Sequence, residues 1–301
     1  MTKKQAIGIL CALTANLIFG FSFIFSKLAL SVSHPLIILS IRFGFAFIFL
    51  NLLWLFGAFK LEFKTKKMLH LLLMGLAQPL LYFIFELYGL SLVSSALSGI
   101  IIALVPVFVM LLSAVFLKEK PNILQTFFTV ISILGISIIS ITSNNGDKNH
   151  FLGIILLVCA VICAAVFNIL SRSQSNCFTP FERTYVMFLI GFIGFNMISV
   201  LTFKGEYPVL IFEAITNAKF LIAIFYLAII SSVFAFLLYN LSTSYITAIQ
   251  SSSFSNIITV VTVLAGVFIL EETLCLLEYI LCGIIIIGVW GVNKFANLNQ
   301  K

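Results

Sequence analysis

Two charged side chains inside long apolar runs are the residues best placed to bind a solute or a proton. Arg42 lies within the apolar run 35–57, and Glu86 lies at a similar depth within the run 68–90. A charge inside a membrane span is costly, and it commonly faces a partner or a water-filled cavity. We predict that Glu86 carries a coupling proton or binds a substrate amine, and that Arg42 holds a carboxylate or tunes Glu86. The alternative is that Glu86 is an interfacial carboxylate and Arg42 a structural brace.

A stripe of polar side chains follows one face of the ninth apolar run. Hydroxyl residues recur there every four positions, which places them on one helical face: Thr247, Ser251, Ser255 and Thr259. We favour cavity lining for the flanking Gln250 and Asn256, because an amide is hard to satisfy within one helix. For Ser251, and for Ser98 in the fourth run, close helix packing is the favoured interpretation, and both remain candidates for substrate contact.

Five further residues bring polar, aromatic or helix-breaking character to membrane depth and are weaker candidates for substrate binding. They are Asn16 and Phe19 in the first run, Tyr82 in the third, Pro106 in the fourth and Tyr239 in the eighth. Pro106 lacks a backbone N–H and is expected to kink its helix. Thr259 takes the corresponding place in the ninth run, which predicts a straighter helix there. Helix packing is the alternative role for each of the five.

These side chains require a framework of membrane-spanning helices. The 301 residues are 62% hydrophobic and only 9% charged, with a mean hydropathy of +1.22, so the charges are too few to coat a water-soluble globule. Runs of roughly 20 apolar residues span a hydrocarbon core of about 30 Å as helices. The sequence predicts an all-α integral membrane protein with ten transmembrane helices, near 6–30, 35–57, 68–90, 95–117, 122–142, 151–171, 182–203, 219–241, 246–270 and 275–294.

The ten spans divide into two sets of five, in residues 1–145 and 146–301. The chain matches itself at an offset of 145 over the first two spans and of 153 thereafter, with pairs that include Gly8 and Gly153, Lys27 and Arg172, Ser98 and Ser251, and Glu119 and Glu272. The eight extra residues fit a longer loop at 204–218. Because five is odd, the second set crosses the membrane in the opposite sense, which predicts two inverted five-helix repeats.

The basic residues orient this framework. With the N-terminus in the cytoplasm, most of the 17 lysines and arginines fall in cytoplasmic ends and loops, including the basic segment 60–67. The positive-inside rule therefore predicts a multi-pass protein of the plasma membrane with both termini cytoplasmic. Lys27 is expected to mark the outer end of the first helix. The net charge of +7 then serves orientation, and we expect no nucleic-acid partner.

Several short segments can be matched to a known family. The first run contains an aromatic-Gly-x-Ser-x-x-x-x-Lys segment at 19–27, Tyr88-Gly89-Leu90 precedes Ser94-Ser95-Ala96, and Leu-x-Glu endings close the fourth and ninth runs at Glu119 and Glu272. With the ten spans, these segments resemble the EamA branch of the drug/metabolite transporter superfamily over nearly the whole chain. The resemblance implies transport through a central cavity by alternating access. The glycine of each ending is replaced by Lys118 or Glu271, which puts a tight helix end at those places in question.

The sequence and the resemblance together predict a secondary transporter for a small polar metabolite. An amino acid or similar solute leaving the cell fits best, with protons as a candidate coupling ion and the lipid bilayer as surroundings. The sequence contains no Gly-x-x-x-x-Gly-Lys loop for ATP hydrolysis, and its three histidines are isolated. We expect no enzyme activity, no metal site and no cofactor. The alternatives are a non-transporting membrane subunit or passive pore, and then a membrane-embedded enzyme; the oligomeric state is not defined.

Overall fold

The computed structural model describes residues 3–62, 68–116, 122–142, 148–246, 248–271 and 276–295, and these residues form helices with no strand among them. Seven of the described helices are long and apolar enough to cross a membrane. Three shorter apolar helices, Thr126–Gly135, Ile257–Ile269 and Tyr279–Gly288, lie within the three remaining predicted spans. The chain is therefore an all-α, multi-pass membrane protein, as the composition predicts.

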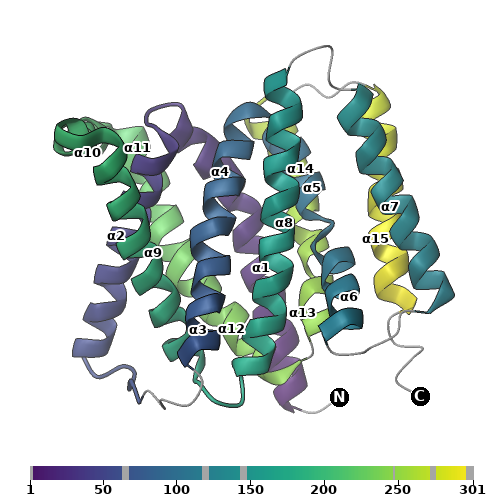
Figure 1. Cartoon of the computed structure of the whole chain (residues 1–301), viewed down its shortest axis with the longest axis horizontal. Helices are drawn as coiled ribbons and strands as arrows, with labels where there is room; N and C mark the ends of the chain where they lie inside the picture. The colour runs from purple at the N-terminus through teal and green to yellow at the C-terminus, as the bar shows by residue number, and fades with distance from the viewer. Residues whose placement is uncertain are drawn as a thin grey trace.

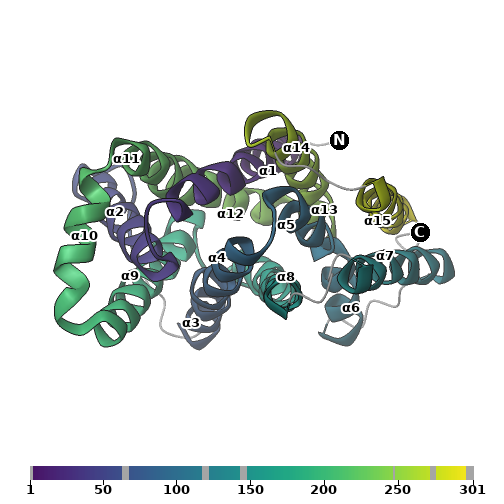
Figure 2. The ribbon, with the colours of Figure 1, turned by 90° about the horizontal axis from the view of Figure 1, so that it is seen from above.

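The helices stand side by side as an upright bundle, with α7 packed along α15 at one edge (Figures 1 and 2). In the first half of the chain the elements are α1 (Lys3–Leu30), α2 (Pro35–Leu55), α3 (Met68–Gly75), η2 (Leu76–Leu81), α4 (Tyr82–Leu92), α5 (Ser95–Ile102), α6 (Val105–Phe116) and α7 (Ile123–Thr142). In the second half they are α8 (Lys148–Gln174), α9 (Pro180–Phe203), η3 (Lys204–Glu206), α10 (Tyr207–Thr216), α11 (Ala218–Phe225), η4 (Tyr226–Phe234), α12 (Ala235–Tyr245), α13 (Ala248–Ser253), α14 (Ser255–Ile269) and α15 (Leu276–Phe295).

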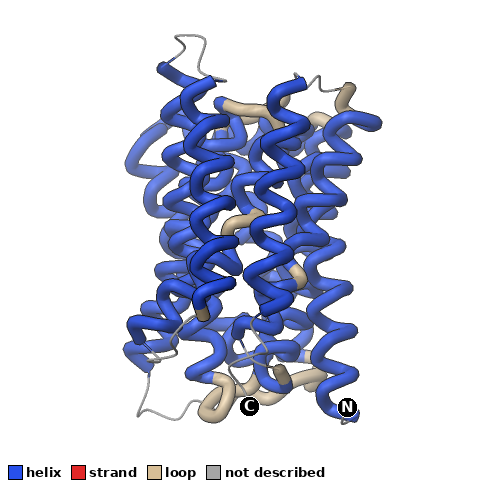
Figure 3. The backbone as a smooth tube through the Cα atoms, turned by 90° about the vertical axis from the view of Figure 1, so that its right-hand side faces the viewer, coloured by secondary structure: helices blue, strands red, loops and turns tan. Residues whose placement is uncertain are grey.

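The fourth and ninth predicted spans are both interrupted inside the bundle. Ala103 and Leu104 separate α5 from α6, and Phe254 separates α13 from α14; short loop segments are visible at mid-height in Figure 3. Pro106 lies in the first turn of α6, where its missing N–H is tolerated and the predicted break occurs. The ninth span breaks without a proline. Around Phe254, backbone N–H groups donate to the carbonyl oxygen three residues earlier, as in a 3₁₀ turn. Thr259 therefore does not keep that span continuous.

The third and eighth predicted spans each contain a π-helical segment. In the third span, η2 includes Gln78, whose backbone is extended at φ −146° and ψ 118°. In the eighth, η4 covers nine residues. The offset of 153 places η2 on the second part of η4, so both halves depart from a regular α-helix at corresponding places, with a kink at Gln78 in η2 alone. Wide turns of this kind are frequent at functional sites.

The longer loop predicted at 204–218 is wrong, because most of this segment is helical. The 3₁₀ turn η3 leads into α10, which has Pro208 in its first turn and a short apolar run behind it. Seen from above, α10 lies across the edge of the bundle beside α2 and α9 (Figure 2). Ten residues are too few to cross a membrane, so the length of the apolar run did not predict this helix.

One helix ending can be compared with the family pattern. Lys118, Glu119 and Glu272 lie outside the described residues. Glu271 follows the end of α14 and has φ +53°, the left-handed conformation that glycine commonly provides after a helix C-terminus. The α14 ending therefore keeps the backbone geometry of a glycine, and a non-glycine residue there carries strain of about 1–2 kcal/mol.

Two basic residues that the repeat pairs make corresponding contacts. Lys27, in the last turn of α1, donates its Nζ proton to the carbonyl oxygen of Val93 at 2.6 Å, beyond the end of α4. Arg172, in the last turn of α8, donates to the carbonyl oxygen of Thr243 at 2.8 Å, near the end of α12. Each cation thus neutralises the negative end of a helix.

Gly8 and Gly153 also occupy corresponding places. A Cβ atom on Gly8 would lie 3.0 Å from Tyr245 Cβ, and one on Gly153 would lie 2.8 Å from Val93 Cγ1 and 2.9 Å from Leu92 Cβ. The offset of 153 pairs Leu92 with Tyr245. Both glycines therefore allow close packing against the end of α12 or of α4.

Gly153→Ala is expected to destabilise the protein by about 1–3 kcal/mol, because the added methyl group overpacks the α8–α4 contact. The measurement is the melting temperature of purified protein in detergent. Gly283→Ala is the matched control, since nothing lies within 4 Å of a Cβ atom built there. A Gly153→Ala protein as stable as the control would show that α4 and α8 are not closely packed at this point.

Candidate functional site

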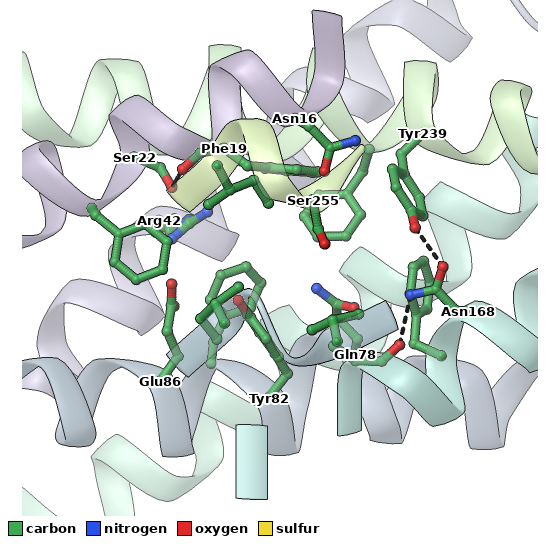
Figure 4. Close-up of a pocket in the computed structure, with 18 residues that line it drawn as sticks. Asn16, Phe19, Ser22, Arg42, Gln78, Tyr82, Glu86, Asn168, Tyr239 and Ser255 are labelled. Carbon is green, nitrogen blue, oxygen red and sulfur yellow. Dashed lines mark hydrogen bonds between the residues drawn. The ribbon is translucent and has the colours of Figure 1, made fainter. Parts of the chain in front are cut away.

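A central cavity lies among helices from both halves of the chain. Its wall is formed by residues of α1, α2, η2, α4 and α8, by α12, and by both helix breaks, where α5 meets α6 and where α14 begins (Figure 4). Ile102 and Val105 line it from the first break, and Ser255 and Ile258 from the second. The offset of 153 relates these two pairs, so both halves contribute corresponding positions.

Arg42 forms one end of the cavity, and its side chain is 2% exposed. Its Nε donates to Ser232 Oγ at 2.9 Å, and a terminal nitrogen donates to Ser231 Oγ at 3.4 Å. The guanidinium carbon also lies 4.3 Å from the ring centre of Phe83, a cation–π contact. Because both serines belong to η4, Arg42 connects α2 to the π-helical segment of the eighth span.

Glu86 lines the same end of the cavity, and it is also 2% exposed. Its carboxylate points towards Arg42 in Figure 4. The Oε2 atom is buried and has no hydrogen-bond partner in the described part of the chain, so the expected pairing with Arg42 is not made through this atom. A buried carboxylate oxygen without a hydrogen-bond partner is unfavourable. This oxygen is therefore suited to take up a proton or to bind the cationic group of a ligand.

Amide and aromatic side chains form the rest of the wall. Asn16 and Asn168 each donate to a carbonyl oxygen one turn earlier in their own helices, which leaves the amide oxygen for other partners. The Asn168 oxygen accepts a hydrogen bond from Tyr239. Phe19 packs edge-on against Phe236, with ring centres 5.0 Å apart. This part of the cavity combines apolar surface with a few fixed polar groups, which is typical of small-molecule sites.

The structure brings six of the eleven predicted site residues to the cavity wall: Arg42, Glu86, Asn16, Phe19, Tyr82 and Tyr239. Ser98, Pro106 and Ser251 are not among the lining residues. Ser98 donates to the Ser94 carbonyl at 2.8 Å, and Ser251 lies 3.5 Å from the hydroxyl of Ser242, which fits helix packing. Gln250 and Asn256 belong to α13 and α14, and their side chains lie outside the described residues. Substrate contact remains a prediction for all eleven.

Four polar lining residues were missed as site candidates: Ser22, Gln78, Asn168 and Ser255. Asn168 and Gln78 carry the signal that singled out Asn16, an amide inside an apolar run, and Gln78 also precedes Pro79. Ser255 belonged to the polar stripe, but its position at a helix break was not visible in the sequence.

A second polar cluster, outside the cavity wall, surrounds Arg183 near the start of α9. Arg183 is fully buried and donates to the backbone carbonyls of Ser171 and Asn240 and to the hydroxyls of Ser171, Thr243 and Ser244. These partners come from α8 and α12. The cluster holds three helices together, and Asn240 lies next to the cavity residue Tyr239.

Comparison with known proteins decides the family. The model of the EamA-like transporter family matches residues 6–141 and again residues 151–294. This chain belongs to the EamA-like transporter family. Its resemblance to EamA proteins is thereby confirmed, and the family indicates a membrane transporter for a small solute rather than an enzyme.

Relatives of this EamA-like chain agree with that conclusion. An uncharacterized transporter of Bacillus subtilis (strain 168), YcxC, is 34% identical over 99% of this chain and 96% of that protein. An uncharacterized transporter of Archaeoglobus fulgidus is 26% identical over 95% of this chain and 98% of its own length. One crystal structure shares the fold, with a TM-score of 0.67, 14% identity, and coverage of 98% of this chain and 99% of that one.

Proposed function

We propose that this EamA-like protein is a secondary transporter that moves a small polar metabolite, an amino acid or similar solute, out of the cell by alternating access. The observation that carries the proposal is the cavity itself, which both halves line and which contains Arg42 and a Glu86 carboxylate with one oxygen lacking a partner in the described part of the chain. A buried acid and a buried base in one cavity fit a solute that carries both charges. They also allow Glu86 to bind a coupling proton.

An inverted repeat of five plus five helices accounts for the corresponding contacts on the two sides of the cavity. Lys27 and Arg172 each cap a helix of their own half, and the cavity residues Ile102 and Ser255, each next to a helix break, are paired by the offset of 153. The family also matches the chain twice, in ranges close to the proposed repeats 1–145 and 146–301. Two such halves rocking about a fixed central site would expose it to each side in turn.

A plasma-membrane location with both termini in the cytoplasm completes the proposal. In Figures 1 and 3, α1 begins and α15 ends at the same side of the bundle. Lys60 lies just beyond the end of α2 on that side as well, and it begins the basic segment 60–67 of the sequence. The positive-inside rule then assigns this side to the cytoplasm.

The experiment that tests transport is uptake of a labelled amino-acid panel by purified protein in liposomes, with and without an imposed pH gradient. Accumulation above the external concentration is expected for at least one solute, because a coupled transporter uses the gradient. Equilibration without accumulation would favour a passive pore. Absence of flux for every amino acid, in protein that remains folded, would remove amino acids as the substrate class.

A further inference from the structure

The helix α14 begins at the wall of the central cavity. Ser255 is its first residue, and both Ser255 and Ile258, one turn later, line the cavity. Helices whose N-termini point into a cavity present amide groups and the positive end of the helix dipole to it. Such an end attracts negatively charged groups.

Ser255 adds an independent sign of a ligand at this helix end. Its side chain is only 5% exposed, and its Oγ atom has no hydrogen-bond partner in the described part of the chain. Figure 4 shows this hydroxyl pointing into the cavity on the side of Gln78. No side chain caps the N-terminus of α14. A buried hydroxyl without a partner is costly for the fold alone, and this hydroxyl is therefore available to a ligand that enters the cavity.

The corresponding helix end in the other half lacks these donors. Ile102, which the offset of 153 pairs with Ser255, ends α5 and has no hydroxyl, and α6 begins three residues later at Val105. Pro106, in the first turn of α6, has no backbone N–H. The two helix ends at the cavity are thus chemically different, and the α14 end is the better one for an anion.

We propose that the N-terminus of α14, together with the Ser255 hydroxyl, binds the carboxylate group of the transported solute. Arg42, the carboxylate partner expected from the sequence, already donates two of its five N–H groups to the hydroxyls of Ser231 and Ser232. Glu86 lines the same cavity, where its carboxylate can carry the coupling proton. The group of the solute that the α14 end recognises is therefore its carboxylate. This assignment rests on the transporter function proposed above and names the group that its central site recognises.

Binding measured by thermal shift tests the assignment on the full-length protein in detergent. The probes are a panel of amino acids and, for each acid that raises the melting temperature, its carboxamide, which keeps the amine but lacks the negative charge. The proteins are wild type, Ser255→Ala, Ser255→Thr and the control Ser199→Ala. Ser199 is also a buried serine, but its hydroxyl donates to the Leu36 carbonyl and lies outside the cavity wall.

The wild type is expected to bind at least one acid about tenfold more tightly than its carboxamide, because hydrogen bonds to a charged group are the stronger ones. Ser255→Ala should bind that acid about tenfold more weakly and the carboxamide equally well, whereas Ser255→Thr and Ser199→Ala keep the preference. Without ligand, Ser255→Ala should melt at or above the wild-type temperature, since the hydroxyl it removes has no partner in the fold.

Three results would overturn the assignment: wild type that binds none of the acids, wild type that does not distinguish acid from carboxamide, or Ser255→Ala with undiminished preference. Flux in liposomes separates this failure from failure of the proposed function. Binding with the expected preference but without flux would support the carboxylate site and contradict the transporter function. Flux together with an unchanged acid preference in Ser255→Ala would support the transporter function and contradict the carboxylate site.

Discussion

Arg183→Ala is expected to destabilise the protein by about 3–5 kcal/mol, because several buried hydrogen bonds are lost at once. The side chain is fully buried, and it makes five hydrogen bonds to groups of α8 and α12. Alanine leaves the carbonyl oxygens of Ser171 and Asn240 without this donor, inside the bundle where water is scarce. The measurement is the melting temperature in detergent, which should fall by at least about 6 °C.

Arg172→Ala is the matched control, because Arg172 is only half-buried and makes one described hydrogen bond, to the Thr243 carbonyl. Its expected cost is about 1 kcal/mol. Arg183→Lys should fall between the two, since an ammonium has fewer donors and cannot reproduce the planar fork of a guanidinium. Equal melting temperatures for Arg183→Ala and Arg172→Ala would show that the Arg183 cluster does not hold the helices together.

The overall helical framework could be predicted because apolar runs of sufficient length have few other stable structures in lipid. Apolar length does not reveal where a helix is interrupted. The break at Phe254 occurs in a segment without proline, and α10 is a helix too short to count as a span. The conformation of Glu271 was equally hidden, because it depends on how the end of α14 is held rather than on the residue's own preference.

The charged part of the site could be predicted because a buried charge is expensive and therefore rare. Arg42 and Glu86 stand out in the sequence for this reason. Their partners could not be predicted in the same way. Serines are common in membrane helices and pack or bind equally well, so nothing in the sequence distinguished Ser232, which binds Arg42, from Ser98, which bonds to its own helix. The difference arises from the three-dimensional position of η4 and of the helix breaks.

Glu86→Gln is expected to abolish the response of transport to a pH gradient and to reduce gradient-driven flux at least about tenfold. Glutamine has nearly the shape of glutamate but cannot take up or release a proton. If Glu86 is the group that carries the coupling proton, the variant can still exchange solute down its own gradient but cannot accumulate it. The measurement is uptake into liposomes at several imposed gradients, with solute exchange measured on the same preparation.

Two controls separate this effect from other changes in charge. Glu213→Gln removes an exposed carboxylate on α10 and should leave the gradient response intact. Burial lowers the pKa of His34 at the α1–α2 junction, so His34→Gln tests whether that imidazole contributes to the pH dependence. Loss of both exchange and accumulation in Glu86→Gln alone would assign Glu86 to the amine of the solute. Unchanged flux with unchanged pH dependence would show that Glu86 neither carries the coupling proton nor binds the amine. A carboxylate in either role cannot be replaced by an amide without effect.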